Sequence, residues 1–197
     1  MRLIIGITGA TGAIYGVRLL EHLRDAGVET HLVISRWGAR TLVHETPYSR
    51  EQVEALAHTA YAPGDMGAAI SSGSFQTAGM IVVPCSAKTL GAVAHGYGDN
   101  LIHRAADVVL KERRKLLLVV REAPLSDIHL ENMLKLSRMD AVILPPMPAF
   151  YNNPRSLADI VDHTVARILD QFGVDVPSAA RWSGEMGVGP DASLSED

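Results

Sequence analysis

The stretch Ile5-Gly6-Ile7-Thr8-Gly9-Ala10-Thr11-Gly12-Ala13-Ile14-Tyr15-Gly16 decides how this chain is organised. Residues 2–7 form an apolar, β-branched run, which is typical of a buried strand, and apolar residues recur at helical spacing over 14–23. A glycine turn between a strand and a helix brings backbone N–H groups to the positive helix end, where they can hold an anion. The hydroxyls of Thr8 and Thr11 favour such a site over the alternative, a turn that only packs strand against helix.

The spacing of these glycines narrows the class of ligand that the turn can bind. It is Gly-x-x-Gly-x-x-Gly and not the Gly-x-Gly-x-x-Gly of dinucleotide-binding folds, and no Gly-Lys-Ser/Thr of a Walker loop follows. The next expected strand, 29–34, leads into Ser35 and Arg36 and not into the acidic residue that holds the ribose of NAD. A phosphate-bearing ligand other than NAD is therefore favoured, while NADP stays open because Arg36 can meet its 2′-phosphate.

Composition disfavours several classes of protein. The chain has 197 residues, of which 47% are hydrophobic and 20% charged, which suits a single domain with a full core. A net charge of −4 gives no support for nucleic-acid or anionic-membrane binding. Cys85 is the only cysteine, so no intrachain disulfide forms, and no base beside it indicates a nucleophile. The apolar runs are too short for a signal peptide or a membrane span, so we expect a cytoplasmic protein.

Apolar runs and helical patterns alternate along the chain, as in a parallel sheet that helices cover on both faces. Strands are expected over 2–7, 29–34, 80–84, 116–120 and 140–144, with a sixth suspected within 61–75. Helices are expected over 14–26, 37–45, 51–58, 86–94, 100–114, 126–137 and 156–172. We predict a three-layer α/β/α, doubly wound fold of the Rossmann-like or flavodoxin-like kind. It forms a single domain over 1–173, followed by a tail over 174–197 that is rich in Pro, Ser and Gly.

Polar side chains follow nearly every expected strand. In chain order the residues at these strand ends are Thr8, Gly9, Thr11, Ser35, Cys85, Ser86, Lys88, Thr89, Arg121, Glu122 and, beyond a run of prolines, Tyr151, and all but Gly9 have a polar atom in the side chain. In a doubly wound sheet, ligands bind beyond the carboxyl ends of the strands. Hydroxyls with an arginine and a glutamate suit a phosphate group and a proton transfer. We therefore predict a small-molecule site at this edge, with ordinary solvated loop ends as the alternative.

Three further signals are ambiguous on pattern alone. Ser86 lies where a helix begins, so it can hold an anion or simply cap the helix. Arg104 and Lys111 share one helix face with Asp107 between them, and either face a ligand or form a solvated ladder of ion pairs. Arg167 lies among apolar residues of the last helix, and either extends outward to water or reaches an anion.

An ordered set of motifs covers about 3–172 of the chain. They are Gly9-Ala10-Thr11-Gly12-Ala13-x-Tyr15-Gly16, Pro84-Cys85-Ser86-x-x-Thr89-Leu90, the stretch 100–113, Arg121-Glu122-Ala123-Pro124-Leu125, the stretch 128–133, Phe150-Tyr151 and Val165-Ala166-Arg167-Ile168-Leu169. Together they resemble the UbiX-like (UbiX/Pad type) flavin prenyltransferases. Thr11 stands where many members have serine, which keeps the hydroxyl, and Lys88 lies at a position expected to vary. Beyond Gly173 only Arg181-Trp182 matches, and loosely.

The resemblance implies a metal-independent transfer of dimethylallyl from dimethylallyl phosphate to N5 and C6 of reduced FMN. A monophosphate donor is favoured over a diphosphate. The prenylated FMN would serve a UbiD-like decarboxylase, in aromatic or phenolic-acid decarboxylation or in the ubiquinone pathway. Family members assemble as homo-dodecamers with sites at subunit contacts, so we expect the same here.

The resemblance also implies roles by position. FMN would be bound by Gly9, Ala10, Thr11, Ser35, Ser86, Ala87, Lys88, Thr89 and Arg121. The prenyl phosphate would be bound by Tyr151, Arg167, Lys111 and Arg104. The catalytic residues would be Glu122, Glu45 and Lys111. Glu122 would give a proton to the leaving phosphate and later take one back, and Glu45 would accept a proton near the flavin. No metal ligand is implied.

Two other classes stay open on the sequence. FMN-dependent cysteine decarboxylases carry Pro-x-Ser-Ala-Asn-Thr and a catalytic histidine before it, whereas here the Asn position is Lys88 and no histidine lies between Ala60 and Pro84. NADP-binding, reductase-like proteins share Thr8-Gly9-Ala10-Thr11-Gly12 but usually need Tyr-x-x-x-Lys, which this sequence lacks.

Overall fold

A computed structural model describes residues 1–177, 181, 182 and 184, and its centre is one parallel sheet. Within these residues the sheet has six strands in the order β3-β2-β1-β4-β5-β6. The strands are β1 (Arg2–Ile7), β2 (Glu29–Ile34), β3 (Thr59–Tyr61), β4 (Gly79–Cys85), β5 (Lys115–Val120) and β6 (Val142–Ile143). The strand order reverses between β1 and β4, the position where ligands bind in sheets of this kind.

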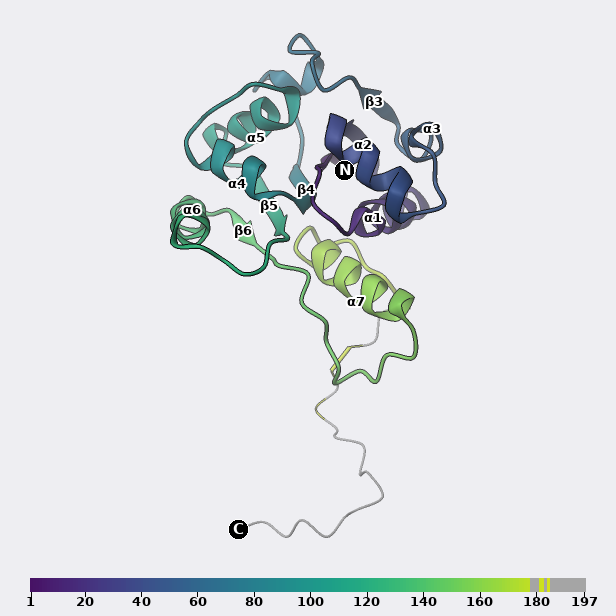
Figure 1. Cartoon of the computed structure of the whole chain (residues 1–197). Helices are drawn as coiled ribbons and strands as arrows, with labels where there is room; N and C mark the ends of the chain where they lie inside the picture. Colours follow the sequence, from purple (N-terminus) through teal and green to yellow (C-terminus); the bar gives the residue numbers. More distant parts are fainter. Residues whose placement is uncertain (178–180, 183, 185–197) are drawn as a thin grey trace, which may run out of the picture.

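Helices cover both faces of the sheet (Figure 1). They are α1 (Ala13–Asp25), α2 (Arg36–Glu45), α3 (Arg50–Glu54), the short 3₁₀ helix η1 (Ala69–Ser71), α4 (Ala87–Ala94), α5 (Leu101–Lys111), α6 (Asp127–Ser137) and α7 (Leu157–Asp170). The helices α1 and α7 pack side by side on one face, while α4, α5 and η1 cover the other face and α6 packs against α4. The predicted three-layer, doubly wound fold is confirmed.

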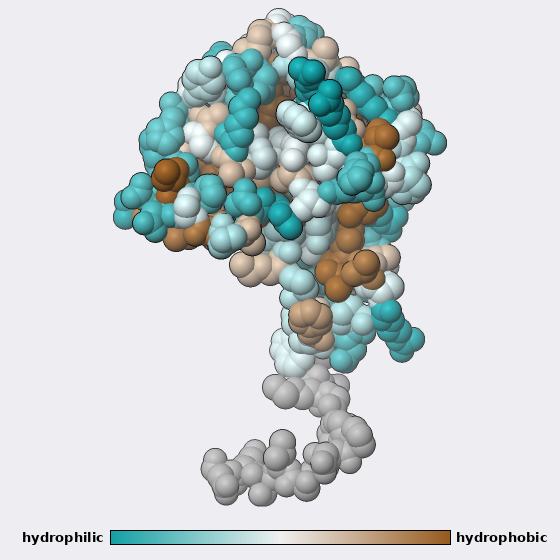
Figure 2. Space-filling view, viewed as in Figure 1, coloured by the Kyte–Doolittle hydropathy of each residue, from teal (hydrophilic) through white to brown (hydrophobic). Residues whose placement is uncertain are grey.

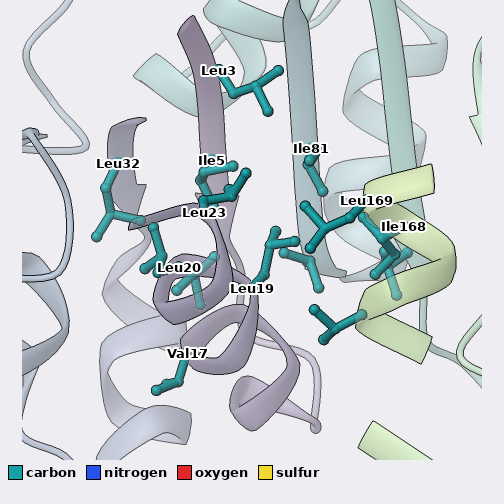
Figure 3. Packing of buried hydrophobic residues seen from close by; sticks show 14 of the residues in the cluster. Leu3, Ile5, Val17, Leu19, Leu20, Leu23, Leu32, Ile81, Ile168 and Leu169 are labelled. Carbon is teal, nitrogen blue, oxygen red and sulfur yellow. The ribbon is translucent and has the colours of Figure 1, made fainter. Parts of the chain in front are cut away.

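Two hydrophobic clusters, one on each face, form the core. Alternate residues of a strand point to opposite faces, so Ile5 packs toward α1 and α7 while Ile4 packs toward α5. Figure 3 shows the first cluster, in which Leu20 and Leu23 of α1 and Ile168 of α7 meet the strands. Because both faces are buried, the strands read as continuous apolar runs, and this is why the sequence revealed them. No helix in the described residues is long and apolar enough to cross a membrane.

The predicted helix over 51–58 is shorter in the structure. It ends at Glu54, and Thr59–Tyr61 pairs with β2 as the edge strand β3, just before the segment where a sixth strand was suspected. Two hydrogen bonds hold the turn between α3 and β3 against β2. The backbone N–H of His58 donates to Thr30 Oγ1 (3.3 Å), and the Thr30 N–H donates to His58 Nδ1 (3.2 Å).

Two other predicted boundaries also move. The helix expected over 100–114 ends at Lys111, because Arg113 takes a left-handed conformation (φ 55°) that stops it. The strand expected over 140–144 is only Val142–Ile143, preceded by the left-handed Asp140 (φ 65°).

The end of the domain stays a prediction. Val174 and Val176 are buried against the cluster that contains α1 and α7, so the chain packs on the core a little beyond residue 173. Most of the predicted tail over 174–197 lies outside the described residues.

Candidate functional site

The carboxyl ends of β1 and β4 are tied together by one buried hydroxyl. Thr8 Oγ1 donates to the carbonyl of Pro84 (2.7 Å) and accepts from the backbone N–H of Ser86 (2.9 Å). Thr8 is only 2% exposed, so its hydroxyl serves the fold rather than a ligand. The bonds bring the loop after β1 beside the start of α4.

The start of α1 is held by a carboxylate of the chain itself. Gly12, with φ 97°, caps the helix, and Glu45 at the end of α2 accepts from the N–H groups of Gly12 (2.8 Å) and Ala13 (3.1 Å). Burial alone would raise the pKa of Glu45, but hydrogen bonds from Thr11, Gly12 and Ala13 outweigh it and lower the pKa. The anion that the glycine turn predicts at this helix end is therefore, in this structure, Glu45.

The turn after β1 packs tightly against the start of α2. A Cβ on Gly9 would come within 2.5 Å of Trp37 Cβ, and a Cβ on Gly38 within 2.6 Å of the Ile7 carbonyl oxygen. Ser35 caps α2, its Oγ accepting from the N–H of Gly38 at 2.9 Å. Glycines at these two positions thus allow the loops after β1 and β2 to meet.

These loops enclose what we call the strand-end cavity, of about 420 Å³. Its lining is Thr8, Gly9, Ser35, Arg36, Trp37, Pro63, Gly64, Ser86, Lys88, Thr89, Asp99, Asn100 and His103. Of the residues predicted to bind FMN, Gly9, Ser35, Ser86, Lys88 and Thr89 line it. Thr11 lines a neighbouring hollow with Glu45, while Ala10 lies in the loop after β1 and Ala87 is the first residue of α4.

Ser86 caps α4, as the alternative interpretation of its position proposed. Its Oγ accepts from the N–H of Thr89 (3.3 Å), and its hydroxyl donates to Thr89 Oγ1 (3.2 Å). Thr89 therefore keeps its own hydroxyl hydrogen for another acceptor. Capping and ligand binding are compatible at this turn, because Ser86 caps α4 and still lines the cavity together with Thr89.

Sequence reasoning missed His103 in this cavity. The side chain is buried on α5, and its Nδ1 lies 2.8 Å from Asp99 Oδ1, while Lys88 Nζ lies 3.4 Å from Asp99 Oδ2. Burial lowers the pKa of His103, and the Asp99 carboxylate opposes that shift. Asn100 caps α5 by accepting from the His103 N–H (3.1 Å), so the Asn-x-x-His spacing was the available signal.

A second cavity, which we call the α7 cavity, has a volume of about 400 Å³. Its lining is Tyr151, His163, Ala166, Arg167, Asp170, Arg181 and Trp182. Arg167 Nη1 lies 2.7 Å from Asp170 Oδ2. Arg181 donates two hydrogen bonds to the same carboxylate, from Nη2 to Oδ1 (2.9 Å) and from Nη1 to Oδ2 (3.0 Å). The hydrogen bonds from Arg181, with the charges of both arginines, lower the pKa of Asp170 against its burial. Asp170 thus pairs with both guanidinium groups, and Arg181 also lies 3.4 Å from Asp175 Oδ1, so two arginines and two carboxylates meet beside this cavity.

Arg104 and Lys111, predicted to join Tyr151 and Arg167, lie elsewhere in the chain. Arg104 pairs with Asp107 (2.9 Å) and donates to the Ser71 carbonyl (3.2 Å), and Lys111 pairs with Glu112. Both sit on α5, which covers the opposite face of the sheet from α7. Within one chain the four residues therefore do not form one site.

Arg121 and Glu122 follow β5 at the same edge of the sheet and are exposed. The backbone N–H of Arg121 donates to the Cys85 carbonyl (3.0 Å), and Glu122 Oε1 accepts from its neighbour's N–H (3.2 Å). Across the part of the chain that the structure describes, Glu122 forms no ion pair, neither with Arg121 nor with Lys111, which pairs with Glu112. Burial raises the pKa of the Cys85 thiol to about 12, which suits an inert side chain.

Comparisons with known proteins agree with one another. The sequence model of the flavoprotein family matches residues 1–169. A probable UbiX-like flavin prenyltransferase from Streptomyces sp. (strain D7) is 62% identical over 185 residues, which cover 93% of this chain and 92% of that protein.

Two solved structures are close in fold and sequence. A dodecameric FMN-dependent UbiX-like decarboxylase from Escherichia coli O157:H7 matches with a TM-score of 0.92 and 62% identity, covering 93% of this chain and all (100%) of that one. AnUbiX (PadA1), in complex with FMN and dimethylallyl pyrophosphate, matches with a TM-score of 0.93 and 52% identity, covering 94% of this chain and 98% of that one.

Proposed function

This chain belongs to the UbiX-like flavin prenyltransferases, and on that premise we propose that it prenylates reduced FMN. The transfer breaks the allylic C–O bond of dimethylallyl phosphate and forms bonds to N5 and C6 of the flavin. The protons released at N5 and C6 pass to the leaving phosphate and to the alkene, so the products are prenylated reduced FMN and inorganic phosphate, with no net oxidation. When bound, reduced FMN supplies the nucleophile, so the protein needs none of its own.

The strand-end cavity is the observation that carries this proposal. Its volume of about 420 Å³ lies within the usual range of small-molecule sites, and its wall combines hydroxyls with the cations Lys88 and Arg36. This donor set fits the phosphate and hydroxyl-bearing chain of FMN. We assign FMN binding to Gly9, Ser35, Ser86, Lys88 and Thr89, which line the cavity, with Ala10, Thr11, Ala87 and Arg121 as the adjoining members.

We assign the prenyl phosphate to the α7 cavity. Tyr151 supplies a hydroxyl there, and Arg167 and Arg181 have more N–H groups than their hydrogen bonds to Asp170 and Asp175 use. Such cations stabilise the charge that develops on a leaving phosphate without a metal ion. AnUbiX was crystallised with dimethylallyl pyrophosphate, so both the monophosphate, which we favour, and the diphosphate belong in the assay.

The missing half of the phosphate site comes from another copy of the chain. The relative from Escherichia coli is dodecameric, and hydrophobic side chains are exposed on and before α7, where Figure 2 shows brown patches. The exposed hydrophobic side chains in this region include Met147, Phe150 and Leu157, which are 73%, 70% and 83% exposed. Exposed apolar patches mark contact surfaces. We infer a homo-dodecamer in which Arg104 and Lys111 of one copy face Tyr151 and Arg167 of the next.

Subunit mixing tests this assembly. The variants Arg104→Ala and Arg167→Ala should each be weakly active alone, and co-assembly should restore part of the activity because some sites then contain both arginines. An active monomer in sedimentation, or mixtures no better than the separate variants, would contradict the shared site.

Glu122 and Glu45 handle protons in this proposal. Glu122 gives a proton to the leaving phosphate, and Glu45, whose lowered pKa keeps it ionised, accepts one near the flavin. Prenylated FMN is a cofactor and not an end product, so we propose a UbiD-like decarboxylase as its recipient and the cytoplasm as the place of transfer.

Mass spectrometry of the flavin tests the activity itself. After incubation with prereduced FMN and dimethylallyl phosphate or pyrophosphate, the flavin should gain the mass of one five-carbon prenyl group, and omission of the donor is the control. A purified protein that carries FMN is also yellow, whereas an NADP complex is not. Unmodified flavin with both donors would overturn the proposal.

A further inference from the structure

His163 of α7 is a buried histidine beside a residue of the proposed phosphate site. Its Nε2 lies 3.2 Å from Tyr151 Oη, and the two rings meet edge to face with centroids 5.6 Å apart. Trp182 also meets the Tyr151 ring edge to face, with centroids 5.8 Å apart. The Tyr151 ring therefore contacts two aromatic side chains, and only His163 hydrogen-bonds to its hydroxyl among the residues described.

The second ring nitrogen decides which way this hydrogen bond runs. His163 Nδ1 is buried and has no hydrogen-bond partner within the described residues. If Tyr151 donated to Nε2, Nδ1 would carry a buried N–H without an acceptor. Buried N–H groups without an acceptor are rarer in proteins than unpaired acceptors. The contact therefore favours Nε2–H as the donor to the phenolic oxygen.

This direction leaves the Tyr151 hydroxyl hydrogen unused. Because the oxygen accepts from His163, its own hydrogen is available to the α7 cavity, which both residues line with Arg167. A neutral hydroxyl donor beside two guanidinium groups suits an anion with several oxygens, such as phosphate.

We propose that His163 is a positioning residue, which holds the Tyr151 hydroxyl so that it donates to the leaving phosphate. This inference rests on the proposed function, in which the α7 cavity binds the prenyl phosphate. His163 itself does not touch the reacting atoms. Its effect passes through one hydrogen bond, so removing the Tyr151 hydroxyl should remove it.

A double-mutant cycle on the FMN-loaded enzyme tests the proposal. His163→Leu should raise the KM for dimethylallyl phosphate and the Kd for inorganic phosphate by about tenfold, the worth of a single hydrogen bond, and should spare FMN retention. His163→Gln should restore most of this loss, because its amide nitrogen can donate from the place of Nε2. In a Tyr151→Phe background, His163→Leu should cause no further change.

The control is His22→Gln on α1, a half-buried histidine that does not line the α7 cavity. Its Nε2 forms no hydrogen bond within the described residues and lies 3.9 Å from Asp162 Oδ1, and the variant should leave both constants unchanged. Should His163→Leu not fold, His163→Asn replaces it, because its shorter amide does not reach the Tyr151 oxygen. Unchanged KM and phosphate affinity, or equal losses in both backgrounds, would overturn the proposal and leave His163 a packing residue. If the wild type makes no adduct, the proposed function fails, while calorimetry with inorganic phosphate still decides the role of His163.

Discussion

The strand-end cavity and the α7 cavity are similar in volume but are held together in different ways. The first is fixed by backbone turns and neutral hydroxyls, such as the Thr8 bond that ties β1 to β4. The second depends on side chains from a loop, a helix and the segment after it, with Asp170 shared between two arginines. A cavity made of strand ends keeps its shape without a ligand, whereas one made of exposed ion pairs is completed by what binds to it. This difference suits a firmly held flavin and an exchanging phosphate donor.

The largest effect is expected at Glu122, which lines neither cavity within a single chain. Glu122→Gln keeps the size of the side chain but removes the transferable proton. Loss of a general acid or base costs ~10²–10⁴-fold in rate, so the variant should bind FMN and donor yet stall in adduct formation. Single-turnover kinetics measure this, and Glu131→Gln, at an exposed position of α6, is the control. Wild-type rates of phosphate release and adduct formation would remove Glu122 from the mechanism.

The next effect isolates the strand-end cavity. Ser86→Leu removes the α4 cap and fills the cavity wall with an apolar side chain, so FMN should no longer be retained after purification. Loss of the cap should destabilise the fold by only about 1 kcal/mol, and circular dichroism should stay native. FMN titration gives the affinity, and Ser126→Leu, at the cap of α6, is a matched control for the loss of a helix cap. An unchanged FMN affinity would show that this cavity is not the flavin site.

The counterpart in the α7 cavity is Arg167→Ala. Removing a charge-assisted hydrogen bond of about 1.5–3 kcal/mol should weaken the binding of the prenyl donor by roughly 10- to 100-fold and leave the affinity for FMN unchanged. Donor KM and FMN Kd, measured on the same preparation, separate the two cavities. Lost FMN with an untouched donor KM would mean that the two ligands are assigned the wrong way round.

The smallest effect is one on stability, separate from the rate loss that a proton acceptor implies, and it concerns Glu45, which caps α1 beside the strand-end cavity. Its pKa is lowered in the folded chain, so its contribution is present above the unfolded pKa and is lost as the pH falls through the folded pKa. Glu45→Gln should therefore cost about 0.3–1 kcal/mol at pH 7, the usual worth of a charge at a helix end, and nothing in strong acid. Urea unfolding at both pH values measures this. A variant of wild-type stability that fails only in turnover would assign Glu45 to proton transfer alone.

The sequence predicted the strand-end cavity better than the α7 cavity, and the reason is physical. Ser86 caps α4 through Thr89, three residues further on, so the local pattern carries that information. The glycine spacing likewise marks the turn after β1, although Gly9 itself packs against the distant Trp37. The capping of α1 by Glu45 joins residues 33 positions apart, and the Tyr151–His163 contact joins a loop to a helix. A lone histidine in a helix does not reveal what it faces. Likewise, Arg104 and Lys111 were grouped with Tyr151 by resemblance, and only the placement of α5 and α7 on opposite faces separates them within one chain.

The measurement that most directly tests whether the two cavities serve one reaction is a count of both products in the same samples. Wild-type enzyme with prereduced FMN and dimethylallyl phosphate is stopped at intervals, and inorganic phosphate and prenylated flavin are quantified together. We predict equal amounts of the two at every time point. Phosphate released without a matching flavin adduct, or no release of phosphate at all, would contradict the account.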